Sequence, residues 1–176
     1  SMAESAENKR LLGRYQLSDR IGEGGSAVVY RAHDTWLGHQ PVVLKLQRES
    51  QEDLTGHLRR EYALLIRLRH PHIVRVRELA HLSAEDRLPD VPSEALCLIE
   101  DSVPGEPLHE WAEGRAIGDV AAVGAQIAAA LAALHAAGVR HGDLRPDNIL
   151  VHETPHGPHD TLIDFGLSSR SSSGNT

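Results

Sequence analysis

The chain has 176 residues, of which 40% are apolar and 24% charged, a balance typical of a folded globular protein. Its formal net charge of -7 argues against a nucleic-acid or anionic-membrane surface, because both require a clustered positive field. The single cysteine, Cys97, excludes an intrachain disulfide framework and fits a reducing, cytoplasmic setting. We expect no membrane segment, since the alanine-rich residues 121–137 also carry Gln126 and His135.

The N-terminal part predicts two strands separated by a glycine loop. Residues 1–12 begin with Ser1-Met2 and are expected to be a disordered tail or an expression remnant. Residues 15–21 nearly alternate in polarity, residues 22–26 are too rich in glycine to continue a strand, and residues 27–32 favour β structure again. Glycines let backbone amides approach phosphate oxygens closely. A plain hairpin turn is the alternative, and a dinucleotide-binding fingerprint is disfavoured because a strand follows the glycines.

The third predicted strand, residues 41–46, contains one charged residue, Lys45. The chain has only two lysines, Lys9 and Lys45, against sixteen arginines. A compact ammonium within an apolar strand suits the α- and β-phosphates of ATP, which a bulkier guanidinium would fit less well. The alternative is a lysine that simply faces solvent.

Residues 52–69 predict a helix in which Glu61 shares one face with leucines. The leucines of this face are Leu54, Leu58, Leu65 and Leu68. A carboxylate inside an apolar stripe is unfavourable unless a cation partners it, and Lys45 lies on the preceding strand. The sequence therefore predicts a buried pair between Lys45 and Glu61.

The middle of the chain predicts a loop at residues 80–94, a fifth strand at residues 95–99 and a linker at residues 100–105. A helix is expected over residues 120–137, stopped by Gly138. Its apolar face consists of Val123, Ile127, Leu131 and Leu134. Residues 152–160 contain three histidines but also prolines and a glycine, which favours a solvated turn over a metal site.

Two acidic motifs near the C-terminus carry the chemistry. Asp143 and Asn148 lie on one short loop that contains Pro146, just before an apolar run. They supply a base or hydroxyl-orienting group and a neutral oxygen ligand for magnesium. Asp164, in the sequence Asp-Phe-Gly, follows a second short strand at residues 161–163. Either motif alone could be a turn, but together and in this order they are specific.

With the glycine loop, Lys45 and Glu61, these motifs resemble the eukaryotic-like serine/threonine protein kinases. The resemblance covers residues 15–167 and implies an α+β fold: a five-stranded antiparallel N-lobe sheet with helix C, and a partial helical C-lobe. The N-lobe would be residues 13–101, and residues 102–167 would hold helices D and E, the catalytic loop and Asp-Phe-Gly. Residues 168–176 would be a disordered start of the activation segment. We therefore expect a piece of a longer protein, or a chain whose helix E face is covered by self-association or a partner.

The resemblance also implies ATP and Mg²⁺ as cofactors and a protein serine or threonine hydroxyl as acceptor. The implied catalytic residues are Lys45, Glu61, Asp143 and Arg145, and the implied metal ligands are Asn148 and Asp164. The implied nucleotide-binding residues are Ile21, Gly22, Gly24, Gly25, Val29, Val43, Lys45, Ile99, Glu100, Ser102 and Leu150, with Ile99 as the gatekeeper and the backbone of residues 100–102 facing adenine.

Three residues depart from the family pattern. Ala27 replaces the third glycine, Gly142 the arginine before Asp143, and Arg145 a lysine. The loss of that arginine makes control through a phosphorylated activation loop unfavourable. Two alternatives remain: a nucleotide-binding or scaffolding pseudokinase, and a small-molecule phosphotransferase of the aminoglycoside or choline kinase type, which shares His-Gly-Asp-Leu.

Overall fold

The computed structural model describes residues 8–21, 27–49, 54–139 and 148–163. The chain divides into two compact units, which are considered separately. Unit 1 comprises residues 1–63 and 76–102, and unit 2 comprises residues 64–75 and 103–176.

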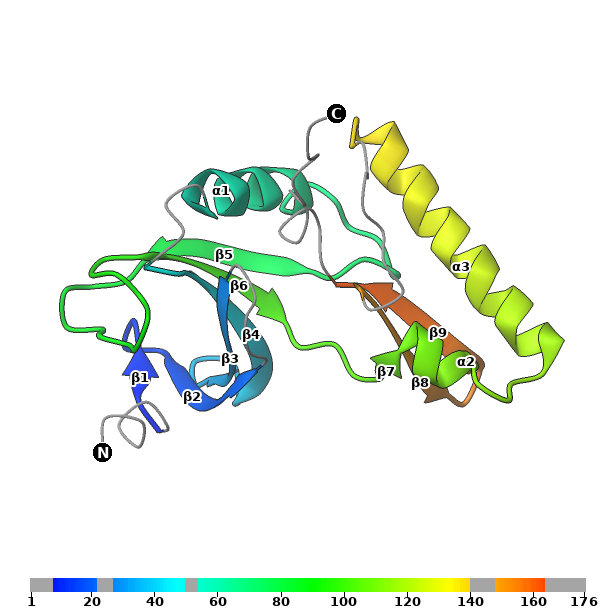
Figure 1. Ribbon diagram of the computed structural model, residues 1–176, viewed down its shortest axis with the longest axis horizontal. Coiled ribbons are helices and arrows are strands. Elements are labelled where there is room, and N and C mark those ends of the chain that lie inside the picture. Colours follow the sequence, from blue (N-terminus) through cyan, green and yellow to red (C-terminus); the bar gives the residue numbers. More distant parts are fainter. Residues whose placement is uncertain (1–7, 22–26, 50–53, 140–147, 164–176) are drawn as a thin grey trace, which may run out of the picture. The chain divides into compact units, whose positions relative to one another are not determined.

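Unit 1 is built on an antiparallel sheet (Figure 1). Its strands are β1 (Arg10–Leu11), β2 (Tyr15–Ile21), β3 (Ala27–Asp34), β4 (Gln40–Gln47), β5 (Val76–His81) and β6 (Leu96–Asp101). They lie in the order β1-β2-β3-β4-β6-β5. The α+β kinase-like prediction is confirmed, with one more strand than expected.

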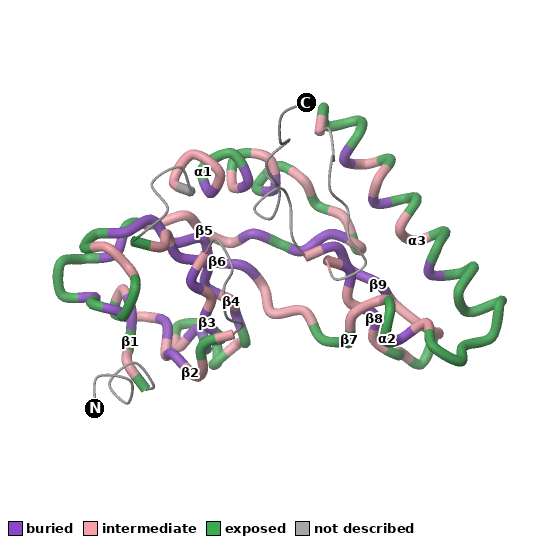
Figure 2. Tube along the Cα trace, in the orientation of Figure 1, coloured by how far each residue is buried: buried purple, intermediate pink, exposed green. Residues whose placement is uncertain are grey.

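The two faces of this sheet differ in polarity because successive side chains of a strand point to opposite sides. One face is an aliphatic and aromatic core, whose strand residues include Val28, Tyr30, Leu44, Leu46 and Ile99. These residues are at most 3% exposed. Figure 2 shows the resulting concentration of buried residues along the central strands. The opposite face carries the charged residue of β4, Lys45.

Two predictions for unit 1 need correction. Residues 10–11 form β1 rather than part of a disordered tail, and Leu11 is fully buried in the core. Residues 82–94 are irregular, as expected, but they supply Leu82 and Leu88 to the core. Asp86 fixes this segment, because its Oδ2 accepts hydrogen bonds from the backbone N–H and hydroxyl of Ser83 at 3.0 and 2.8 Å.

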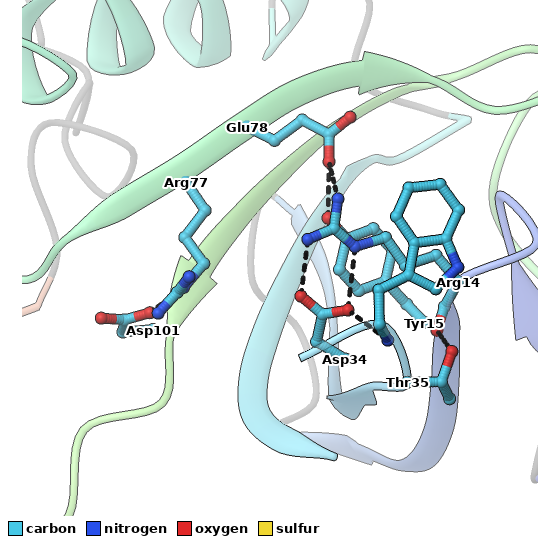
Figure 3. A network of polar contacts seen from close by, with 8 residues as sticks. Arg14, Tyr15, Asp34, Thr35, Arg77, Glu78 and Asp101 are labelled. Carbon is cyan, nitrogen blue, oxygen red and sulfur yellow. Dashed lines mark hydrogen bonds and ion pairs between the residues drawn. The ribbon is translucent and has the colours of Figure 1, made fainter. Parts of the chain in front are cut away.

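A polar network ties the first strands of unit 1 together (Figure 3). Arg14, in the turn between β1 and β2, donates two hydrogen bonds of 2.8 and 2.7 Å to the carboxylate of the fully buried Asp34. The Tyr15 hydroxyl donates to Glu78 at 2.5 Å, and Thr35 Oγ1 donates to the Arg14 carbonyl at 2.5 Å. The Arg14 guanidinium lowers the pKa of Asp34, mainly through these hydrogen bonds.

Helix α1 (Leu54–Leu65) is shorter than the predicted helix. Leu58, Glu61 and Leu65 are buried, so the predicted face is the one that packs. Leu68 lies beyond the helix, where its N–H still bonds the Leu65 carbonyl at 3.1 Å. The described part of the helix therefore begins and ends inside the range that the periodicity indicated.

Unit 2 contains a three-stranded antiparallel sheet in the order β7-β8-β9. Its elements are β7 (Glu106–Pro107), α2 (Leu108–Ala112), α3 (Ile117–Ala136), β8 (Ile149–Thr154) and β9 (Gly157–Leu162). Gly105 is required before β7: its φ is +121°, and a Cβ there would lie 2.5 Å from the Val151 carbonyl oxygen. Ile73 forms a bridge with Leu162, so residues 70–75 extend this sheet.

Most of residues 152–160 form paired strands rather than the solvated turn we expected. His152 pairs with His159 in the β8–β9 ladder, and only residues 155–156 turn. Pro158 is tolerated because β9 is the outer strand of this sheet. Asp160 is fully buried, and burial raises the pKa of its carboxyl.

Helix α3 packs against β9 (Figure 1) through the apolar face that the sequence indicated. The expectation that this face needs self-association or a partner to cover it is therefore wrong, because β9 of the same chain covers it. Val123 and Leu134 are buried there, as is Ala130, and Ile127 and Leu131 are partly covered. Gln126 donates to the Pro158 carbonyl at 2.8 Å and accepts from the Asp160 N–H at 2.9 Å. These contacts fix α3 as a helix of unit 2.

The outer side of α3 differs from expectation. Ile117 is 88% exposed, and the helix is long and apolar enough to cross a membrane by length and composition alone. The expectation that no apolar stretch reaches the length of a membrane-spanning helix is therefore wrong for Ile117–Ala136, by length and composition. Helices buried in soluble proteins pass the same test, but only a small share of this one is covered.

Candidate active site

Three charged side chains from three elements of unit 1 meet on one face of the sheet. Lys45 comes from β4, Glu61 from α1 and Glu100 from β6. Lys45 Nζ lies 3.2 Å from Glu61 Oε1 and 2.8 Å from Glu100 Oε1. The side chains of Lys45, Glu61 and Glu100 are 10%, 1% and 2% exposed. The expected Lys45–Glu61 pair is therefore present, and it has a second carboxylate that was not expected.

Apolar side chains predicted to contact adenine lie on the same face. The strand register aligns Ile21 with Val29 and Val29 with Lys45 across three neighbouring strands. Val43 is two residues from Lys45 on β4 and pairs with Glu100 on β6. Ile21, Val29 and Val43 are all partly exposed. An apolar surface beside a buried ammonium fits the planar base and the phosphates of a nucleotide.

Ile99 is not part of this group. It pairs with Leu44, is fully buried and packs in the aliphatic core on the other side of the sheet. Strand β6 continues through Asp101, so it is Glu100 whose side chain reaches the Lys45 face. A single polar residue at the end of the apolar run 95–99 was the signal that sequence reasoning missed. Glu100, and not Ile99, is therefore the residue of β6 whose side chain lies beside Lys45.

The backbone expected to face adenine is partly engaged in the sheet. Glu100 pairs with Val43 and with Val76 on the two sides of β6. The Ser102 N–H donates to the Pro41 carbonyl at 3.2 Å. Ser102 therefore already has an intramolecular acceptor for the amide that the resemblance assigned to adenine.

In unit 2, the backbone of Asn148 is paired with the residue that precedes the second acidic motif in the sequence. The carbonyl of Asn148 accepts a hydrogen bond from the N–H of Ile163 at 3.0 Å. Ile163 immediately precedes Asp164 in the chain. Asn148 is partly exposed, and Leu150 lies on β8 opposite Thr161. The β8–β9 pairing thus places Asn148 beside Ile163, the last described residue before the Asp-Phe-Gly motif in the sequence.

Several predicted site residues lie outside the described residues. These are Gly22, Gly24 and Gly25 of the glycine loop, Asp143 and Arg145 of the catalytic loop, and Asp164. The predicted site residues that are described on the Lys45 face of unit 1 are Ile21, Val29, Val43, Lys45, Glu61 and Glu100, and Ser102 lies just beyond β6. Those of unit 2, considered by itself, are Asn148 and Leu150.

Histidines gather in unit 2 without forming a metal centre among the described residues. The His72 and His159 ring centroids lie 4.4 Å apart, and His72 Nδ1 lies 2.7 Å from the Asp160 carbonyl oxygen. The backbone N–H of His72 donates to His70 Nδ1 at 3.1 Å, and burial lowers the pKa of His70. Cys97 is fully buried, with its pKa raised by desolvation, which fits a small core residue.

Comparison with known proteins identifies the class. The protein kinase domain family matches residues 15–176, so the chain belongs to the protein kinase family. The crystal structure of the PknI kinase domain of Mycobacterium tuberculosis superposes with a TM-score of 0.67 at 23% identity. The match covers 95% of this chain and 64% of that domain, and it supports the fold.

Among curated relatives, the serine/threonine-protein kinase PkaA of Streptomyces coelicolor is 37% identical over 171 residues. The match covers 88% of this chain and 30% of PkaA. CBL-interacting protein kinase 19 of Oryza sativa is also 37% identical, over 163 residues, with 90% of this chain and 30% of that protein covered. The chain thus spans about 30% of the length of these relatives.

Proposed function

We propose that this chain is the nucleotide-binding and catalytic part of a serine/threonine protein kinase, which transfers the γ-phosphoryl group of Mg-ATP to a protein hydroxyl. One observation carries the proposal: a buried lysine, Lys45, paired with a helix carboxylate, Glu61, beside an apolar strand surface. Burial of an ammonium is unfavourable unless it is paired, and such groups concentrate at functional sites.

The site fits the cofactors that the family uses. Lys45 supplies a fixed positive charge for the α- and β-phosphates, and Glu61 orients that ammonium. Ile21, Val29 and Val43 supply apolar surface for the base. Asn148 and Asp164 are oxygen donors of the type that Mg²⁺ prefers, and Asn148 is paired with Ile163, which precedes Asp164 in the sequence. When bound, Mg²⁺ neutralises charge that develops on the phosphates.

Asp143 and Arg145 complete the proposed catalytic group. Asp143 would orient the acceptor hydroxyl and accept its proton, and Arg145 would place a positive charge near the transferred group. A guanidinium in place of the usual lysine keeps the charge and changes the geometry of the contact. Both residues belong to the catalytic-loop motif and keep these roles as a proposal from sequence.

Phosphoryl transfer by the intact protein tests the proposal. We expect transfer from Mg-ATP to a serine- or threonine-containing protein substrate, and loss of nearly all of it in Asp143→Asn. Nucleotide binding should survive that substitution, because Asp143 is assigned to the hydroxyl and not to the phosphates. Equal transfer by the two proteins would refute the catalytic assignment. Binding of Mg-ATP without transfer by either protein would favour the pseudokinase alternative.

We also propose that the outer side of α3 is covered by another polypeptide, either a second copy or a further segment. Ile117 and Val120 are 88% and 40% exposed on a helix rich in alanine. Covering such surface is favourable by about 25 cal/mol per Å² before the costs of association. Size-exclusion chromatography with light scattering on the 176-residue chain should give an oligomer. A monodisperse monomer that phosphorylates protein efficiently would contradict this proposal.

A further inference from the structure

The charged group around Lys45 contains one more carboxylate than the family pairing requires. Glu100 Oε1 lies 2.8 Å from Lys45 Nζ, closer than the 3.2 Å of Glu61 Oε1. The two glutamate side chains are 1% and 2% exposed, so neither charge is stabilised by bulk water. One ammonium therefore stands between two buried carboxylates.

The fold holds Glu100 in this position. β6 is an inner strand, and Glu100 pairs with Val43 of β4 on one side and with Val76 of β5 on the other. Lys45 lies on the same face of β4, two residues beyond Val43, which makes Lys45 and Glu100 diagonal neighbours across the strand pair. Pairing on both sides fixes the backbone of Glu100, so its side chain stays on the face of the sheet that carries Lys45.

We propose that Glu100 is a positioning residue for Lys45 that also limits the affinity of the site for nucleotide phosphates. This inference rests on the proposed function of Lys45 in nucleotide binding. The Lys45 ammonium donates a hydrogen bond to Glu61, and its charge also lies within ion-pair distance of the Glu100 carboxylate. An incoming phosphate oxygen must share that ammonium with two carboxylates and approach their negative charge. Charges act strongly in a site shielded from water, so the second carboxylate opposes phosphate binding.

A neutral residue of the same shape separates the two effects. Glutamine at position 100 keeps an oxygen that can accept from Lys45, and Glu61 continues to hold the ammonium. Positioning is then preserved while the negative charge is removed. We expect Glu100→Gln to bind Mg-ADP roughly tenfold more tightly than the parent, as loss of one nearby like charge implies.

The control is a second glutamate on the same sheet. Glu78 on β5 pairs with Ile99, the neighbour of Glu100, and its carboxylate contacts Tyr15 and Arg14 instead of Lys45. Glu78→Gln removes the same formal charge from a neighbouring strand, so its affinity for Mg-ADP should equal that of the parent. Glu61→Gln should act in the opposite direction and weaken binding, because Glu61 is the family partner of Lys45.

The experiment is calorimetric titration of the intact protein and its variants with Mg-ADP, together with steady-state kinetics in ATP. We expect Glu100→Gln to lower Kd and the KM for ATP, with a much smaller change in kcat. Glu100→Asp, which keeps the charge, should stay close to the parent. Glu100→Leu is a second neutral variant, with a side chain like the neighbouring Leu98, and it should also bind more tightly than Glu100→Asp. Because leucine offers Lys45 no oxygen, this variant should have a lower kcat than Glu100→Gln, which is the expected sign of lost positioning.

The outcomes distinguish this inference from the proposed function. If the parent binds Mg-ADP and the neutral variants bind it equally or more weakly, the inference about Glu100 is overturned and the proposed function stands. If neither the parent nor the neutral variants bind nucleotide, the proposed function fails and the inference fails with it. Tighter binding by Glu100→Gln and unchanged binding by Glu78→Gln supports both.

Discussion

Among the described residues of unit 1, two groups place one cation beside two carboxylates, and the groups differ mainly in access to water. In the first, Arg14 contacts Asp34 at 2.7 Å and Glu78 at 3.9 Å, and the Glu78 side chain is 39% exposed (Figure 3). In the second, the side chains of both carboxylates around Lys45 are at most 2% exposed. One carboxylate of the first group, that of Glu78, is therefore partly hydrated, whereas both carboxylates of the second group are buried.

This difference in burial separates a structural role from a functional one. Asp34 also accepts the Trp36 N–H at 3.1 Å, so its buried carboxylate is fixed by a guanidinium and a backbone donor. That arrangement secures the start of the sheet. Burying a second carboxylate beside Lys45 costs desolvation free energy, and buried charges of this kind concentrate at functional sites.

The largest expected effect is that of Lys45→Met. It removes the cation that both buried carboxylates contact, so we expect stability to fall by about 3 to 5 kcal/mol and phosphoryl transfer to fall by about 100-fold or more. Chemical denaturation measures the first quantity and a transfer assay the second. The parent should also be stabilised thermally by Mg-ATP, and the variant should not.

The other lysine of the chain is the matched control. Lys9 donates to the Arg87 carbonyl at 2.5 Å at an exposed position, so Lys9→Met should leave nucleotide binding unchanged. If Lys45→Met is stabilised by Mg-ATP as strongly as the parent, Lys45 is only a strand residue and the contrast between the two groups disappears.

The pair between Lys45 and Glu61 could be predicted from the sequence alone. Period-3.6 spacing put Glu61 on the same face as Leu58 and Leu65, and the only cation in an apolar strand was Lys45. The role of the Glu100 side chain was missed because the predicted strand ended at Ile99, two residues before the end of β6, so the face of residue 100 was not considered. Side-chain direction reverses at every strand residue, so an error of one position exchanges the two faces of a sheet.

Other elements escaped prediction for equally local reasons. Strand β1 has two residues, which is too few to show alternation. Pro158 and Gly157 argued for a loop, although an outer strand accepts a proline. Leu82 and Leu88 anchor a segment whose charges and prolines conceal its buried positions. In each case tertiary contacts decided a structure that propensity alone did not favour.

Breaking the first group should affect stability and leave nucleotide binding intact. Arg14→Met leaves the carboxylate of Asp34 buried without its guanidinium, and we expect a loss of about 2 kcal/mol. The double variant with Asp34→Asn should recover part of that loss. Urea denaturation of the four proteins measures the coupling between the two residues. Additive effects of the two substitutions would contradict a stabilising interaction between Arg14 and Asp34.

Acid should weaken this group selectively. The pKa of Asp34 is lower in the folded chain than in the unfolded one, mainly because of the Arg14 hydrogen bonds. Its contribution is therefore complete above the unfolded pKa of about 4 and disappears as pH falls through the lower folded value. The stability difference between the parent and Asp34→Asn should be constant from pH 7 to 5 and shrink below pH 4.

Asp160 extends the contrast to unit 2, because it is a fully buried carboxylate whose pKa is raised by burial. A raised folded pKa favours the protonated form, so the stability that this group contributes is present below the unfolded pKa and is lost as pH rises through the folded value. Asp160→Asn cannot ionise and should be more stable than the parent by about 1 kcal/mol at pH 7. Thermal denaturation at pH 7 and pH 4 tests this, and a larger gain at pH 4 would contradict the sign.

The smallest expected effect is that of Glu78→Gln, and it decides whether burial is the right variable. Glu78 and Glu100 lie on neighbouring strands, and each is one of two carboxylates beside a cation. Glu78 is partly hydrated, and glutamine can still accept the hydrogen bond from the Tyr15 hydroxyl, so stability should change by less than about 0.5 kcal/mol. Because exposed charges are screened by salt, the Mg-ADP affinity of Glu78→Gln should match the parent at 0.1 M salt and above.

If Glu78→Gln tightens Mg-ADP binding as much as Glu100→Gln does, the net charge of the protein controls the affinity of the site and the buried position of Glu100 does not. If only Glu100→Gln binds more tightly, and the gain persists in high salt, burial is what distinguishes the two groups.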